Sequence, residues 1–133
     1  MARRTTVQED LDFEIRFCEG LLAKQPGFVQ ALILLGDLYT RRGFFDQGLA
    51  VDERLTQLLP EDPMVFYNLA CSYSLLGRVE DALVAVKTAI ALGYDDFEHM
   101  GQDLDLENLF KDPRFRDYLT HLKDKRIPAK NCE

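Results

Sequence analysis

Apolar residues recur along the chain at helical spacing, in runs separated by Gly and Pro. This pattern predicts helices over residues 6–24, 28–42, 45–59, 63–76 and 79–92, and a last helix that begins at Asp112-Pro113. Asp62 and Pro63 suit the start of the fourth helix, because Asp accepts hydrogen bonds from free helix amides and Pro fits the first turn. No segment has the alternation of a strand, so an all-α fold is expected.

The second and fourth helices share one layout at an offset of 34 residues. The matched pairs are Leu35 and Leu69, Gly36 and Ala70, Tyr39 and Tyr73, Gly43 and Gly77, Gly48 and Ala82, and Leu49 and Leu83. A single offset at so many positions indicates an internal repeat. At the same offset backwards, Pro60 has a counterpart in Pro26 and Leu55 in Leu21, so the first copy is only half present.

These spacings resemble the tetratricopeptide repeat (TPR) motif. The first copy has Leu32, Leu35, Gly36, Tyr39, Gly48 and Pro60, and the second has Phe66, Leu69, Ala70, Tyr73, Ala82 and Val86. The resemblance implies one domain, a right-handed helical solenoid of about two and a half repeats. Its expected parts are a half repeat at 6–27, repeats at 28–61 and 62–94, a C-terminal cap at 95–124 and a tail at 125–133.

Two positions in the first repeat are unusual. In the TPR register Gly36 lies where the two helices of the repeat cross, and a larger side chain there would push them apart. Asp52 stands where the motif has an aromatic residue. A buried Asp52 would need a hydrogen-bonding partner, so a local rotation that turns Val51 inward instead is expected.

The segment that follows the second repeat resembles the "TPR end-of-group" tail that closes bacterial TPR arrays. The matching residues are Gly93, Tyr94, Asp96, Asp105, Leu106, Leu109, Asp112, Pro113 and Phe115. A solenoid exposes an apolar face at its last repeat, and such a segment would cover it. Its leucines, including Leu104 and Leu106, are expected to enter the core while Asp103 and Asp105 face water.

Charge and composition exclude several classes of function. The net charge is −7, and residues 1–110 hold 9 basic and 19 acidic groups, so the chain would repel nucleic acid and no such partner is predicted. No apolar run approaches the length of a membrane span, and the acidic start of the chain does not resemble a secretory signal, so we expect a cytoplasmic protein without a membrane partner. Cys18, Cys71 and Cys132 are expected to be free thiols.

No motif for catalysis, metal binding or cofactor binding is present. Asp103-Leu104-Asp105 alternates like a calcium loop, but position 108 is Asn where that loop needs Gly, and position 114 is Arg where it needs Glu. His99 and His121 have no partner at metal-ligand spacing, and no nucleophile signature or phosphate loop occurs. A non-enzyme without a metal or cofactor is therefore predicted.

The TPR resemblance implies a concave groove, lined by the first helix of each repeat, that binds a peptide or partner helix. The residues of these helices that packing does not use are Gln30, Ile33, Asp37, Thr40, Arg41, Met64, Tyr67, Asn68, Cys71 and Ser74. Among them Ile33, Met64 and Tyr67 are expected to form an exposed apolar strip that anchors the ligand. Ile33 and Asp37 replace the Lys and Asn of the carboxylate clamp found in some TPR proteins, so a neutral or basic segment is the expected ligand.

Two alternatives to this interaction module stay open. A self-assembling structural subunit would form a homodimer through the first helix, in which Ile15, Cys18, Leu21 and Leu22 face the core but Phe13 and Phe17 do not. A small chaperone that binds a client protein is the other.

Overall fold

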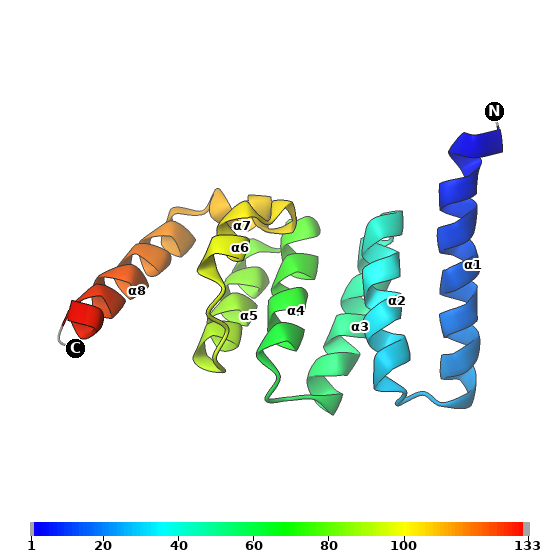
Figure 1. The fold of residues 1–133 in the computed structure, drawn as a ribbon, viewed down its shortest axis with the longest axis horizontal. Helices are drawn as coiled ribbons and strands as arrows, with labels where there is room; N and C mark the ends of the chain where they lie inside the picture. Colours follow the sequence, from blue (N-terminus) through cyan, green and yellow to red (C-terminus); the bar gives the residue numbers. More distant parts are fainter. Residues whose placement is uncertain (1, 132–133) are drawn as a thin grey trace.

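The computed structural model describes residues 2–131, with side chains for residues 7–124, and all the regular structure in that range is helical. Its elements are α1 (Ala2–Lys24), α2 (Val29–Arg42), α3 (Phe45–Leu58), α4 (Pro63–Leu75), α5 (Val79–Ala91), α6 (Phe97–Gln102), the 3₁₀ turn η1 (Leu104–Leu106), α7 (Glu107–Phe110) and α8 (Pro113–Asn131). The helices from α1 to α5 pack one against the next in chain order (Figure 1). The predicted all-α repeat solenoid is confirmed. Within the described range, no helix combines the length and apolar character that crossing a membrane requires.

The two repeats turn in the same way between their helices. Gly43 and Gly77 have φ angles of 86° and 74°, a left-handed conformation that costs glycine little and other residues more. Closing hydrogen bonds of 2.8 Å follow both glycines, from the Phe44 amide to the Tyr39 carbonyl and from the Arg78 amide to the Tyr73 carbonyl. The 34-residue offset read from the sequence therefore extends to individual backbone bonds.

The helix α1 packs like the second helix of an incomplete repeat. Tyr39 donates a hydrogen bond to Glu19 on α1 at 2.5 Å. The same bond recurs 34 residues later, where Tyr73 donates to Glu53 on α3 at 3.4 Å. Of the four residues expected to face the core, Ile15 and Cys18 are buried and the two leucines are partly buried. The helix begins at Ala2, four residues before the predicted start.

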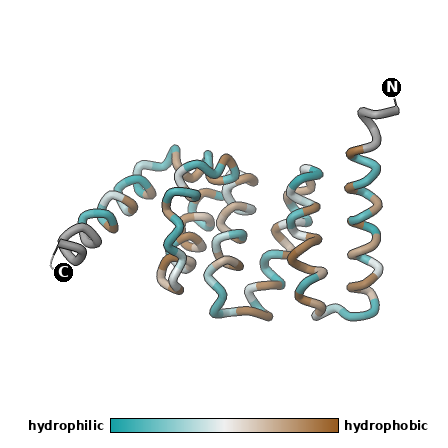
Figure 2. The backbone as a smooth tube through the Cα atoms, in the orientation of Figure 1, coloured by the Kyte–Doolittle hydropathy of each residue, from teal (hydrophilic) through white to brown (hydrophobic). Residues whose placement is uncertain are grey.

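Buried side chains form two clusters, one in each half of the solenoid. The first joins α1, α2 and α3 and includes Leu11, Leu32 and Leu38. The second joins α4 and α5 to the C-terminal segment and includes Val86 and Phe115. Hydrophobic and hydrophilic positions alternate along the helices of both halves (Figure 2).

Gly36 lies at the close crossing of α2 and α3, which confirms its predicted role. A Cβ atom at this position would lie 3.3 Å from Asp52 Oδ1 and 3.4 Å from Val51 Cγ1. Such contacts are tight for a methyl group, and a longer side chain would force the helices apart. In the second repeat Ala70 fills the matching position and is fully buried.

The cap covers the last repeat with only some of the expected leucines. Leu106 and Leu109 are fully buried, but Leu104 is 80% exposed, so the expectation that Leu104 enters the core is wrong. The reason is local: Asp103 caps the 3₁₀ turn by accepting a hydrogen bond from the Asp105 amide at 3.0 Å, which turns Asp103 inward and leaves Leu104 outside.

Two of the three cysteines and the last helix lie within the described residues. Cys18 and Cys71 are buried free thiols, as predicted, whereas Cys132 lies outside the described residues. The helix α8 runs past residue 124, where the cap was expected to end, and reaches Asn131.

Candidate partner-binding site

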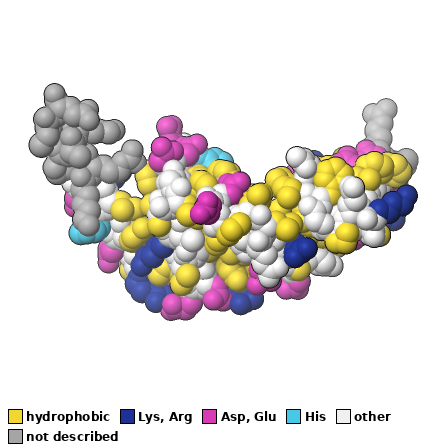
Figure 3. Space-filling model, turned by 90° about the horizontal axis from the view of Figure 1, so that it is seen from below, with side chains coloured by type: hydrophobic (Ala, Val, Ile, Leu, Met, Phe, Trp, Pro, Cys, Tyr) yellow, Lys and Arg dark blue, Asp and Glu magenta, His cyan; other side chains and the backbone are white. Residues whose placement is uncertain are grey.

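A hollow of about 210 Å³ lies between the two repeats and the C-terminal segment. It draws on four parts of the chain: α2, α3, α4 and the stretch from α6 to η1. The molecule is bent, and in Figure 3 hydrophobic and acidic side chains border the inner side of the bend. The concave groove implied by the sequence therefore has a counterpart in the structure.

Seven of the ten predicted groove residues line this hollow. They are Ile33, Asp37, Thr40, Met64, Tyr67, Asn68 and Cys71. Of the other three, Gln30 and Arg41 are exposed beside it, and Arg41 pairs with Asp37 at 3.6 Å. Ser74 is fully buried instead, because its hydroxyl accepts a hydrogen bond from the Leu109 amide at 3.2 Å and so holds the cap.

The expected apolar strip is only partly exposed. Ile33 and Met64 are 48% and 49% exposed, but Tyr67 is only 2% exposed, so its assignment to an exposed strip is wrong. The C-terminal segment folds over α4, and the Tyr67 ring stacks on Tyr94 with centroids 4.4 Å apart. Tyr67 is therefore mainly a core residue, whose hydroxyl reaches the hollow.

Asp103 collects the polar contacts on the cap side of the hollow. Its Oδ2 accepts hydrogen bonds from the Tyr67 hydroxyl at 2.5 Å and the Cys71 thiol at 3.8 Å, and His99 Nε2 lies 3.4 Å away. Burial raises the pKa of Tyr67, and its hydrogen bond to Asp103 raises it further. The expectation that Asp103 faces water is wrong, because its carboxylate ties the cap to α4.

Asp52 lies on the opposite side of the hollow and is 6% exposed. Its Oδ2 accepts a hydrogen bond of 2.5 Å from Ser72, the partner that a buried Asp requires. Val51 is buried too, so α3 turns both residues inward rather than exchanging one for the other. Burial raises the pKa of Asp52 from 3.8 to about 6, and the Ser72 hydrogen bond offsets part of that effect.

The lining is acidic. Four aspartates contribute to it, Asp37, Asp52, Asp103 and Asp105, and no Lys or Arg is among its described residues. Burial raises the pKa of Asp105, and the nearby charges of Asp103 and Asp37 raise it further. The hollow is therefore suited to a positively charged group.

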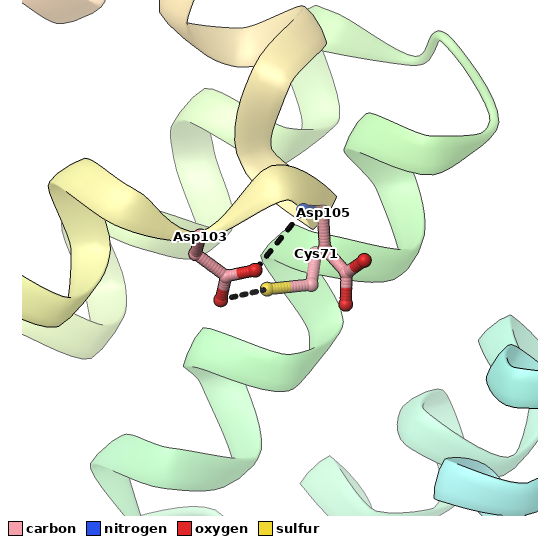
Figure 4. Close-up of side chains that lie close together, drawn as sticks. All are labelled: Cys71, Asp103 and Asp105. Atoms are coloured by element: carbon pink, nitrogen blue, oxygen red, sulfur yellow. Dashed lines mark hydrogen bonds between the residues drawn. The ribbon is translucent and has the colours of Figure 1, made fainter.

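Three donor atoms at the cap end could also hold a metal ion. The three atoms are the Sγ of Cys71 and one carboxylate oxygen each from Asp103 and Asp105, and they lie within 4.8 Å of one another. The thiol is directed at Asp103 (Figure 4). Burial raises the pKa of the Cys71 thiol well above its usual value, and the neighbouring carboxylates add to this. A metal would need the thiolate, which this environment disfavours.

Sequence reasoning missed the cap residues His99, Asp103 and Asp105, and it did not assign Asp52 to the groove. The departure of Asp52 from the repeat motif was the one signal available for it. The cap residues had none, because an alternation of Asp and Leu does not show which set faces inward.

Two phenylalanines form an exposed patch far from the hollow. Phe13 and Phe17 are 64% and 60% exposed on α1, which packs against α2 with its other face. They are four residues apart on one helix and so share a side.

Comparison with known proteins supports the fold. No family model matches the chain. The crystal structure of MamA is similar in fold, with a TM-score of 0.61 and 23% identity over 68% of this chain and 53% of that one. In sequence, the chain is 36% identical over 83 residues to a chloroplastic protein of Arabidopsis thaliana. That match covers 58% of this chain and 24% of the Arabidopsis protein, so the chain spans about a quarter of that relative.

Proposed function

We propose that this protein is a non-catalytic interaction module that holds a segment of a partner protein, a peptide or a helix, in the hollow between its repeats. The observation that carries the proposal is the hollow itself, with half-exposed Ile33 and Met64 in its lining. Apolar side chains beside polar groups in a concavity are typical of binding surfaces.

Site-specific cross-linking tests this proposal. A photoreactive amino acid is placed at Met64, at Ile33 or, as the control, at Val84, which is an exposed apolar residue of α5 outside the hollow. We expect Met64 and Ile33 to cross-link the same segment of one partner in native lysate, and Val84 not to do so. A synthetic peptide of that segment should then bind the purified chain and block the cross-link. Equal cross-linking from all three positions would contradict the proposal.

A small chaperone would use the same hollow for a client protein. The cross-linked segments distinguish the two. An adaptor yields one sequence, whereas a chaperone yields several segments of its client.

The exposed patch of Phe13 and Phe17 favours a second candidate, a structural subunit that forms a homodimer through α1. Light scattering across a concentration series tests it, with a Phe13→Glu, Phe17→Glu double variant as the comparison. A wild-type dimer that the variant converts into a folded monomer would support it. A wild-type monomer at tens of micromolar would exclude it.

A further inference from the structure

Asp52 has an unused hydrogen-bond acceptor at the hollow. Ser72 bonds to Oδ2, but no described residue donates a hydrogen bond to Oδ1. The residue is only 6% exposed, and it still lines the hollow. No fully buried side-chain oxygen or nitrogen of the described residues lacks a hydrogen-bond partner, so Oδ1 keeps contact with the hollow, where a donor group of a ligand can reach it.

Gly36 lies beside this carboxylate at the helix crossing. Gly36 also lines the hollow, and Asp52 Oδ1 lies 3.3 Å from where its Cβ would be. Any other residue would place atoms there. The glycine that lets α2 and α3 cross therefore also keeps side-chain atoms of position 36 away from Oδ1.

The neighbouring side chains suit a long aliphatic stem that ends in a charge. Ile33 and Met64 border the hollow with apolar surface, and Asp37 adds a second carboxylate. Lys and Arg bury their methylene stems along apolar surface and direct the charged head to polar groups. Arginine and lysine also supply donors only, which an unused carboxylate oxygen needs.

We propose that the hollow receives a lysine or arginine side chain of the bound segment, with its cationic head on Asp52. This inference rests on the proposed function and specifies the ligand for it. A divalent metal is the less suitable occupant, because Asp103 already accepts hydrogen bonds from Tyr67 and Cys71.

Peptide selection provides the test. Random twelve-residue peptides are selected on the full chain, and those that still bind an Ile33→Ser, Met64→Ser variant, which loses the apolar border without a change of charge, are discarded. We expect the remaining peptides to share a Lys or Arg at one position. Replacing that residue with norleucine or citrulline should weaken binding by about tenfold to a hundredfold, as for a hydrogen bond to a charged group.

A double-mutant cycle then assigns the contact to Asp52. Asp52→Asn should weaken binding of the cationic peptide by a similar factor and leave the norleucine or citrulline peptide unaffected. The control Asp117→Asn removes a carboxylate at an exposed position of α8, outside the hollow. It should change the affinity for neither the cationic peptide nor its neutral counterpart. Circular dichroism checks the fold of each variant. If Asp52→Asn does not fold, the peptide replacements still decide whether a cation is required.

Each remaining outcome excludes one statement. Selected peptides that bind in the hollow without a Lys or Arg, or a cycle without coupling, would overturn the cation site and leave the groove in place. No peptide sensitive to the Ile33 and Met64 changes would overturn the proposed function itself. Binding that requires added Zn²⁺ and is abolished by EDTA would make the hollow a metal site and contradict this inference.

Discussion

The two repeats share a backbone but differ in the core of their helix crossings. In the second repeat, the residues at these positions are Ala70 and Val86, and both are fully buried. In the first, the same positions are Gly36 and Asp52, so a methyl group and an apolar side chain are replaced by a hydrogen atom and a carboxyl group. The second repeat follows the rules of stable packing. The first departs from them at the edge of the hollow, where we propose that a ligand binds.

The cap adds a second difference between the repeats. Tyr67 corresponds to Ile33 at the 34-residue offset, yet Tyr67 is buried and Ile33 is half exposed. The cap packs on α4 of the second repeat, and the matching face of α2 has no such cover among the described elements. The same repeat position is therefore buried in the core of the second repeat and half exposed at the surface of the first.

The largest expected effect contrasts these two residues. Tyr67→Ala removes a buried ring that stacks on Tyr94 and should lower the free energy of unfolding by about 3–5 kcal/mol. Ile33→Ala should change it by about 0.5 kcal/mol or less, as at an exposed position. Urea unfolding of both variants measures this, and equal losses would show that the cap does not cover α4 as described.

A smaller effect concerns the pH dependence of stability. The pKa of Asp52 is raised from 3.8 to about 6, so between these values the folded state holds a proton that the unfolded state has lost. Stability should therefore fall as the pH rises through this window. The difference of roughly two pH units corresponds to about 3 kcal/mol.

Urea unfolding from pH 4 to pH 8 tests this against Asp52→Asn, with Asp117→Asn as the control. The contributions of Asp105 and Asp112 are common to all three proteins and cancel. Between pH 4 and pH 6 the Asp52→Asn variant should gain stability relative to the wild type, and this gain should level off above pH 6. The Asp117→Asn control should follow the wild type across the range. A constant difference between Asp52→Asn and wild type across the range would contradict the assignment.

A still smaller effect concerns the helix crossing. Gly36→Leu should destabilise the protein by about 1–3 kcal/mol, because its side chain would meet Asp52 and Val51. Gly36→Ala should be mild, since the tight contacts are offset by the gain in helix propensity of about 1 kcal/mol. Thermal melts in which Leu is tolerated as well as Ala would show that the crossing is looser than the structure places it.

The helices and their turns could be predicted from the sequence because each depends on local residues. The left-handed glycines Gly43 and Gly77 and the Asp62 cap are read directly from neighbouring positions. The cover over Tyr67 could not be predicted, because it depends on how a segment more than thirty residues away folds back. The alternation at Asp103 and Leu104 fits either face inward, and only the Asp103 cap of η1 decides between them.

The central claim is that the first repeat keeps a buried carboxyl group open for a cation, and the pKa of Asp52 tests it most directly. Carbon-13 NMR of the labelled carboxyl group, titrated with and without a selected peptide, measures that pKa. We expect a value of about 6 in the free protein and a clear decrease when the cationic peptide is bound, since a nearby positive charge favours the carboxylate. A pKa near 4 in the free protein, or one that the bound peptide leaves unchanged, would contradict the claim.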